Sequence, residues 1–188
     1  MLIPLAAQDW SAYYGWVEDR YGVSWQLGLD DATGDASPPI VPCLLFGAGV
    51  QNRGGEALEF YREVFPGARV GTLATYPAAS GPAVEGAVMY GDLELFGQRL
   101  AVMDAGVEQD TTFTCGVSLI LNCEDDAELD RYWGLLSSVP EAEQCGWCAD
   151  RFGLSWQVLP HDLEELLSAP GAFEKMLAMK KIERSEFL

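Results

Sequence analysis

The sequence predicts an α+β protein made of paired βαβββ units with mixed sheets. Apolar, strand-like runs alternate along the chain with two amphipathic stretches of helical spacing. A segment of fourteen residues also occurs twice, with eight identical positions: residues 14–27 read YGWVEDRYGVSWQL and residues 145–158 read CGWCADRFGLSWQV. Chance does not produce this identity, so we expect the same piece of structure to occur twice.

Each copy of this segment is predicted to form a β-hairpin. In the second copy a short strand covers 146–149, a turn covers 150–153 and a second strand covers 154–159. Gly153 can supply the positive φ that the turn needs, and Asp150 can cap it. The hairpin is therefore the best-defined local structure in the sequence.

The second strand of this hairpin alternates between apolar and polar residues. Leu154, Trp156 and Val158 share one face, which we expect to pack under helices. Ser155 and Gln157 share the other face, which is too polar for that role. We therefore expect that face to line a cavity or to meet solvent.

The other elements follow from hydrophobic periodicity and from turn residues. Two helices are expected, one in each unit, and each follows the first strand of its unit. A hairpin turn is expected at Gly97-Gln98. The predicted elements are strands at 40–46, 68–76, 88–96, 99–104 and 112–123, helices at 54–64 and 125–137, and a helical tail over 162–188 that is broken at 169–171.

The composition limits the kinds of molecule that the protein is expected to bind. The chain has 188 residues, with 11 Lys and Arg against 29 Asp and Glu, a net charge of −18. Such a field repels phosphate backbones, so nucleic acid is not an expected partner, whereas a cationic small molecule is compatible. The plainer reading of this charge is solubility. No apolar run is long enough to span a membrane and no signal peptide is evident, so a cytoplasmic location is expected.

Histidine and cysteine usage limits the chemistry. His161 is the single histidine, so one chain cannot form a two-histidine zinc site. Cys145 and Cys148 have the spacing of a redox pair, but they fall on a predicted strand rather than at a helix start. We therefore expect free cysteines, no metal and no cofactor.

Three stretches carry a resemblance to a known family: EALEFYREVFP at 56–66, the second hairpin segment at 145–157, and MLAMKKI at 176–182. The sequence resembles the PhnB-like branch of the vicinal oxygen chelate superfamily, which includes glyoxalase I, bleomycin-resistance proteins and extradiol dioxygenases. Its members are often labelled 3-demethylubiquinone-9 3-methyltransferase. The resemblance covers 39–188 and, separately, the first thirty residues.

The resemblance implies a domain organisation. Residues 1–29 look like the last three strands of an upstream PhnB-like domain, 30–38 a linker, 39–160 a complete PhnB-like domain and 161–188 a helical tail. Three strands cannot bury a core alone. We therefore expect the first segment to join an intermolecular sheet and the chain to form a homodimer.

The resemblance also implies that the sheets of the paired βαβββ units curl around a cavity. Metal ligands in the superfamily stand on strands; here Gln157 falls where a Glu is usual and Tyr90 where relatives often carry His. The metal pattern is therefore largely lost, although Asp92 and Asp104 could serve as oxygen ligands. Together with the polar and aromatic residues of the hairpin, the expected cavity residues are Gln157, Ser155, Tyr90, Asp92, Trp147 and Asp104.

Three functions follow from the resemblance. The first is a small-molecule-binding protein without catalytic metal, whose ligand is cationic or aromatic, in the manner of the bleomycin-resistance proteins. The second is an enzyme, either a metal-assisted isomerase or lyase, or the methyltransferase of the family label. The third is a degenerate protein with a structural role only. A methyltransferase would need a cofactor loop, for which Phe46-Gly-Ala-Gly is a weak candidate.

Overall fold

The structure, a computed structural model, describes residues 3–8, 11–29 and 38–187. The chain divides into two compact units, Met1–Ile40 and Val41–Leu188. The expected linker lies almost entirely outside the described residues. Each unit is described by itself below.

The N-terminal unit is a three-stranded antiparallel sheet. Its strands are β1 (Ile3–Gln8), β2 (Ser11–Glu18) and β3 (Ser24–Gly28), in the order β1-β2-β3. The turn between β2 and β3 passes through Gly22, whose φ is +84°. This left-handed conformation is one that glycine adopts without a steric cost.

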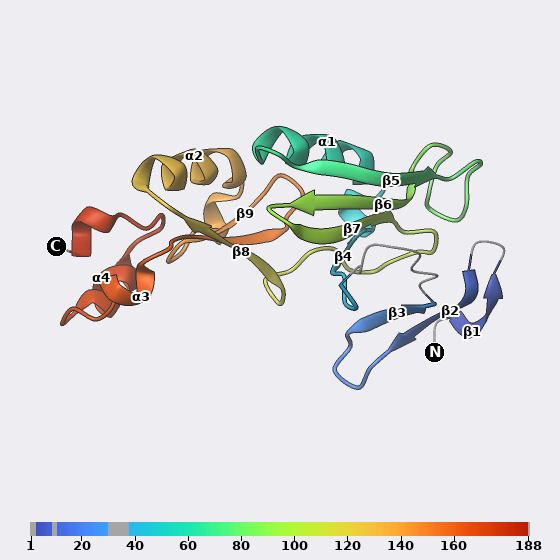
Figure 1. The fold of residues 1–188 in the computed structure, drawn as a ribbon, viewed down its shortest axis with the longest axis horizontal. Coiled ribbons are helices and arrows are strands. Elements are labelled where there is room, and N and C mark those ends of the chain that lie inside the picture. Colours follow the sequence, from blue (N-terminus) through green and yellow to red (C-terminus); the bar gives the residue numbers. More distant parts are fainter. Residues whose placement is uncertain (1–2, 9–10, 30–37, 188) are drawn as a thin grey trace. The chain divides into compact units, whose positions relative to one another are not determined.

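The first half of the second unit is a βαβββ unit (Figure 1). It consists of β4 (Cys43–Phe46), α1 (Gly54–Val64), β5 (Arg69–Thr75), β6 (Val88–Leu95) and β7 (Gln98–Asp104). The sheet order is β4-β7-β6-β5. β4 runs parallel to β7 and the other neighbours are antiparallel, so the sheet is mixed as expected.

Three boundaries differ clearly from the sequence-based expectation. The strand expected at 112–123 covers only Ser118–Cys123. β4 begins only at Cys43, because Pro42 has no amide hydrogen to donate to a neighbouring strand. The turn between β6 and β7 lies at Phe96-Gly97, one residue before the expected Gly97-Gln98, with φ values of +48° and +80°. Two-residue hairpins favour turns with two positive φ values, because their twist matches that of the strands.

The second half has one strand fewer than the first. β8 (Ser118–Cys123), α2 (Asp126–Leu136), β9 (Trp147–Ala149) and β10 (Ser155–Pro160) form a sheet in the order β8-β10-β9. Between α2 and β9, where the first half has a strand, the chain forms a 3₁₀ turn at Pro140–Ala142. The two sheets do not close into a barrel in the described part of the chain.

The core lies between the sheets and the two helices. Figure 1 shows α1 and α2 on the same side of the second unit, and they contact β5–β7 and β8–β10 respectively. Trp156 and Val158 are 3% and 0% exposed, so the apolar face of β10 packs under helices as expected. Aromatic rings fill the centre; they are Phe46, Phe60, Tyr61, Phe65, Tyr132, Phe152 and Trp156. The predicted α+β class is confirmed.

The C-terminal tail forms short helices. α3 (Leu163–Leu166) and α4 (Ala172–Ala178) are separated by the predicted break, and Gly171 begins α4 with a φ of +78°. Buried Ile182 and Phe187 anchor the tail to the core. No helix among the described residues has the length and apolar character needed to cross a membrane.

Candidate ligand-binding groove

The second sheet has one face covered by helices and one face that carries polar residues. β8 and β10 run in parallel, with Ser118 opposite Ser155 and Ile120 opposite Gln157. Because side chains alternate along a strand, these four residues share the face opposite to Trp156. The alternation read from the sequence therefore places Ser155 and Gln157 on one surface.

An open groove of about 530 Å³ lies at the end of this face. Ile120 and Leu159 contribute apolar surface from the strands, and α3 contributes Leu163 and Leu167. The polar side chains in the groove are those of Asn122, His161, Glu164 and Ser168. The groove is thus an apolar surface with several polar groups and one carboxylate.

Gln157 and its neighbours stand beside this groove. The Gln157 amide donates to Ser118 Oγ at 2.8 Å, and Trp147 is its pairing partner on β9. Ser155 is buried, at 7% exposure, which leaves it little surface to offer a ligand. Gln157 and Trp147 are half-buried. Gln157 is therefore a polar neighbour of Ile120 at the groove rather than a lining residue.

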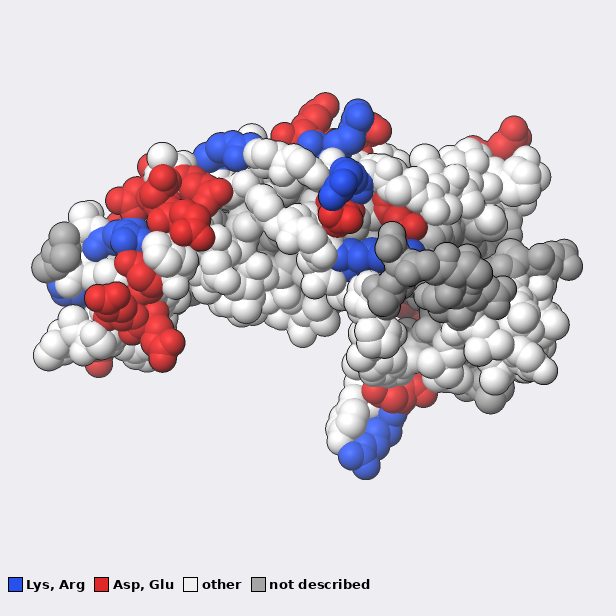
Figure 2. All heavy atoms as spheres, in the orientation of Figure 1, with Lys and Arg blue, Asp and Glu red and all other residues white. Residues whose placement is uncertain are grey.

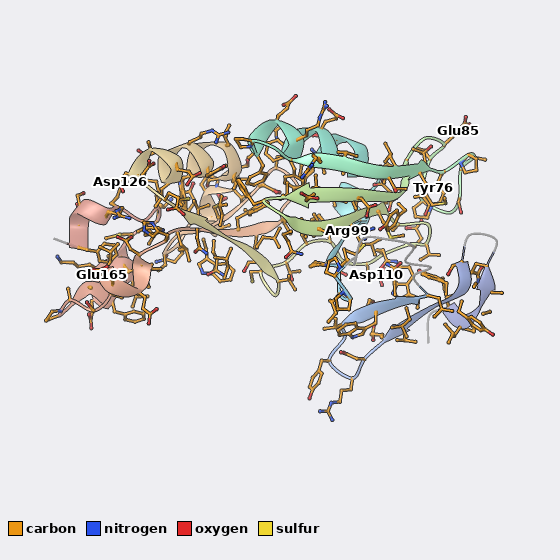
Figure 3. All side chains as sticks on the ribbon, in the orientation of Figure 1. Tyr76, Glu85, Arg99, Asp110, Asp126 and Glu165 are labelled. Carbon is orange, nitrogen blue, oxygen red and sulfur yellow. The ribbon has the colours of Figure 1, made fainter. Side chains whose placement is uncertain are left out.

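A second polar cluster lies on the first sheet. Tyr90 Oη donates to Asp92 Oδ1 at 2.8 Å, and Arg99 Nε donates to the same oxygen at 2.9 Å. Arg99 stands on β7 (Figure 3) and also donates to Tyr90 Oη at 3.2 Å. Burial and the hydrogen bond to Asp92 raise the pKa of Tyr90. The cluster therefore holds a protonated phenol and an ion pair.

Asp104 has a structural role. It is 1% exposed and accepts from the amides of Gly54, at 3.0 Å, and Val88, at 2.8 Å. Burial raises its pKa despite these bonds. Its carboxyl group caps the first turn of α1 and the start of β6, on the side of the sheet where Gly54 stands. Asp104 is therefore not placed together with Tyr90 and Asp92.

The structure thus separates the six expected cavity residues. Ser155, Gln157 and Trp147 meet in the second sheet, Tyr90 and Asp92 meet in the first, and Asp104 lies apart. Gln157 and Tyr90 line neither this groove nor a smaller pocket in the N-terminal unit. In the described ranges, no group of three or more His, Cys, Asp or Glu side chains could hold a metal ion.

The groove residues themselves were not among the expected ones. Asn122, Glu164 and Ser168 belong to no recognisable motif, and neither does His161, the single histidine. The available signal was the alternation of β10, which puts Leu159 on the face of Gln157. That α3 folds back to wall this surface follows only from tertiary packing.

The cysteine pair of β9 does not form a redox site. Cys148 is 1% exposed, and burial raises its pKa to about 12. Cys145 precedes the strand in a left-handed conformation, with a φ of +52°. A reactive pair needs a lowered thiol pKa, so the geometry works against thiolate chemistry.

Fold and groove together define an α+β protein with a βαβββ unit followed by a shorter βαββ unit and an open groove on the second sheet. The family model described as 3-demethylubiquinone-9 3-methyltransferase matches residues 38–159. The chain therefore belongs to this PhnB-like family.

Among solved structures, the chain is similar to a PhnB protein from Bacillus cereus whose description also carries the methyltransferase name. The two share 28% identity with a TM-score of 0.55, over 65% of this chain and 99% of that one. A protein from Pseudomonas aeruginosa is 23% identical over 64% of this chain and 95% of its own, with a TM-score of 0.49. Among curated proteins, none matches this chain.

Proposed function

We propose that the protein binds a small molecule, without metal, in the groove between β8, β10 and α3. The observation that supports this is the composition of the groove: apolar Ile120 and Leu159 form its strand surface, and Glu164 brings one carboxylate to it. Ligand sites commonly combine an apolar lining with a few polar groups that set orientation. The groove has both parts.

The charge of the protein favours a basic ligand. The net charge is −18, and Figure 2 shows acidic side chains gathered over α2 and the C-terminal helices. A field of one sign raises the local concentration of ligands of the opposite sign. A flat, weakly basic molecule would place its ring against Ile120 and Leu159 and its cation near Glu164.

A thermal-shift screen tests this proposal. The wild-type chain is screened with aromatic amines, cationic antibiotics and S-adenosylmethionine, because a ligand that binds only the folded state raises the melting temperature. The Ile120→Arg variant fills the groove with a cation, and Val117→Arg is its control, since both residues are exposed, at 60% and 72%, and Val117 lies outside the lining.

We expect an aromatic amine to stabilise the wild type and Val117→Arg equally and to lose its effect on Ile120→Arg. Glu164→Gln should weaken a cationic ligand and leave its neutral analogue unaffected. Equal stabilisation of both arginine variants would exclude the groove as the binding site. Stabilisation by S-adenosylmethionine alone, lost in Ile120→Arg, would favour the methyltransferase chemistry that the family description names.

A further inference from the structure

The N-terminal sheet has an apolar face that its own unit leaves uncovered. Trp25 and Leu27 alternate along β3, opposite Val17 and Gly15 of β2. Trp25 is 39% exposed and Leu27 is 49% exposed. An apolar pocket of about 270 Å³ lies in the same unit, lined by Leu5, Tyr13, Leu27, Gly28 and Leu29.

The same face is buried in the second hairpin of this chain. Both hairpins have one register: Val17 pairs with Trp25, and Cys148 pairs with Trp156. Trp156 is 3% exposed, against 39% for Trp25. Two similar apolar faces, each with a tryptophan at the same position, therefore differ in how far they are covered.

In the second hairpin this face is covered by α2, which contacts β9 and β10, and by α1, whose side chains contact Asp150 and Trp156. The Tyr61 hydroxyl donates to Asp150 Oδ2 at 2.7 Å. The rings of Tyr61 and Phe65 lie 5.9 and 5.3 Å from that of Trp156. Phe60 packs against Phe152 at 5.7 Å. The pattern Phe-Tyr-x-x-x-Phe on α1 thus contacts both the carboxylate and the indole of the hairpin.

The first hairpin has the same carboxylate and indole that α1 contacts in the second hairpin. Asp19 accepts from the amides of Tyr21 and Val23, at 2.8 and 3.0 Å, and from Trp25 Nε1 at 3.1 Å. Asp150 accepts from the amides of Phe152 and Leu154 and from Trp156 Nε1 at 2.9, 3.1 and 2.9 Å. Among the described residues, no side-chain hydroxyl donates to Asp19 in the way that Tyr61 donates to Asp150.

Charge also fits a helix of this kind. Glu18 is exposed and Asp19 is half-buried, and hydrogen bonds, chiefly from Trp25, hold the pKa of Asp19 below its usual value. At the second hairpin, Arg53 beside α1 stacks over Phe152, and Arg151 stacks over Phe60. Tyr21 and Arg20 stand at the positions of Phe152 and Arg151 in the first hairpin. In the first hairpin Arg20 lies over the ring of Tyr21, 4.6 Å from its centroid. An incoming helix would therefore meet an acidic acceptor and an aromatic ring that already carries a cation on one face.

We propose that this face of the N-terminal sheet docks an amphipathic helix of another polypeptide, with the pattern Phe-Tyr-x-x-x-Phe. Its tyrosine hydroxyl donates to Asp19 and its rings cover Trp25 and Leu27. The helix α1 of the same molecule cannot take this place, because Tyr61 and Phe65 are already engaged by Asp150 and Trp156. The proposal is independent of the groove on the second sheet.

A peptide with the sequence of residues 53–66 tests this contact. Its positions 59 and 63, exposed in α1 and one turn apart, are cross-linked so that the peptide stays helical. Binding to the full chain is measured by calorimetry. The matched variants are Leu27→Glu and Ser24→Glu, which place the same charge on opposite faces of β3.

We expect the peptide to bind wild type and Ser24→Glu alike and to bind Leu27→Glu at least tenfold more weakly. A peptide with Tyr61→Phe should bind wild type about tenfold more weakly, since it lacks the donor to Asp19. This peptide comparison uses the wild-type chain and so does not depend on the folding of any variant.

Three results would overturn the proposal. The first is no binding of the cross-linked peptide to wild type. The second is equal binding to both glutamate variants. The third comes from sedimentation without peptide: a dimer that Leu27→Glu abolishes and Ser24→Glu retains would show that a second copy of the chain covers the face.

Discussion

The carboxyl group of Asp150 is a sensitive point of the second unit. It is 0% exposed and accepts four hydrogen bonds, from two turn amides, the Trp156 indole and the Tyr61 hydroxyl. It therefore joins the hairpin of β9 and β10 to α1. The Asp150→Ala substitution removes the acceptor and leaves the two side-chain donors buried.

The expected cost follows from these donors. A buried donor without a partner costs about 1–3 kcal/mol, so two of them cost about 2–6 kcal/mol. Part of this free energy is regained, because the variant no longer buries a carboxylate. Burial of an ion whose interactions do not fully compensate for lost hydration costs several kcal/mol. We expect a net loss of about 3 kcal/mol, which is a shift of about 1–2 M in the urea midpoint.

Urea unfolding followed by tryptophan fluorescence measures this loss. Asp19→Ala is the matched control, because Asp19 has the same three internal bonds but is only half-buried, so water can reach the donors that lose the carboxylate. We expect the control to leave the main transition unchanged. An Asp150→Ala midpoint within the error of wild type would refute the view that this network ties the two halves together.

Two further predictions concern titration. Burial raises the pKa of Asp150 above 3.8, although its four hydrogen bonds act in the opposite direction. The folded state then holds this proton more tightly, so the stability that Asp150 contributes falls as the pH rises from below 3.8 toward neutrality. The free-energy loss in Asp150→Ala should accordingly be larger in acid, and a loss that grows with pH would contradict this. Cys148, with a pKa of about 12, should resist iodoacetamide in the native protein, whereas exposed Cys115 reacts; mass spectrometry of alkylated peptides checks both.

Local patterns predicted most of the second unit. Helical spacing located α1 over Gly54–Val64 and α2 within 125–137, where Asp125 caps the helix by accepting from the Glu128 amide at 2.8 Å. The turn of the second hairpin was also predictable, since Asp150 and Gly153 occupy the positions that such a turn needs. These features depend on residues close together in the sequence.

The candidate site was predicted only in part. Alternation along β10 correctly placed Gln157 and Ser155 on the face away from Trp156. Asp104 was grouped with Tyr90 because both fall on neighbouring strands, but its side chain points to the helix side and caps α1. The expected turn and the observed turn both put Asp104 on the face away from Tyr90, because moving a two-residue turn by one residue shifts the register by two and keeps each residue on its face. Membership of neighbouring strands was therefore not enough to group the two residues.

The amino-acid order alone was enough to establish the family, the order of helices and strands and the shared design of the two hairpins, because periodicity, turn chemistry and sequence identity are local properties. Tertiary structure was needed to find the groove beside α3, to show that the two polar clusters stand in different sheets, and to show that Trp156 is buried under helices whereas Trp25 is not covered within its own unit. Those features depend on which distant segments meet, and that is decided by burial of apolar surface over the whole unit.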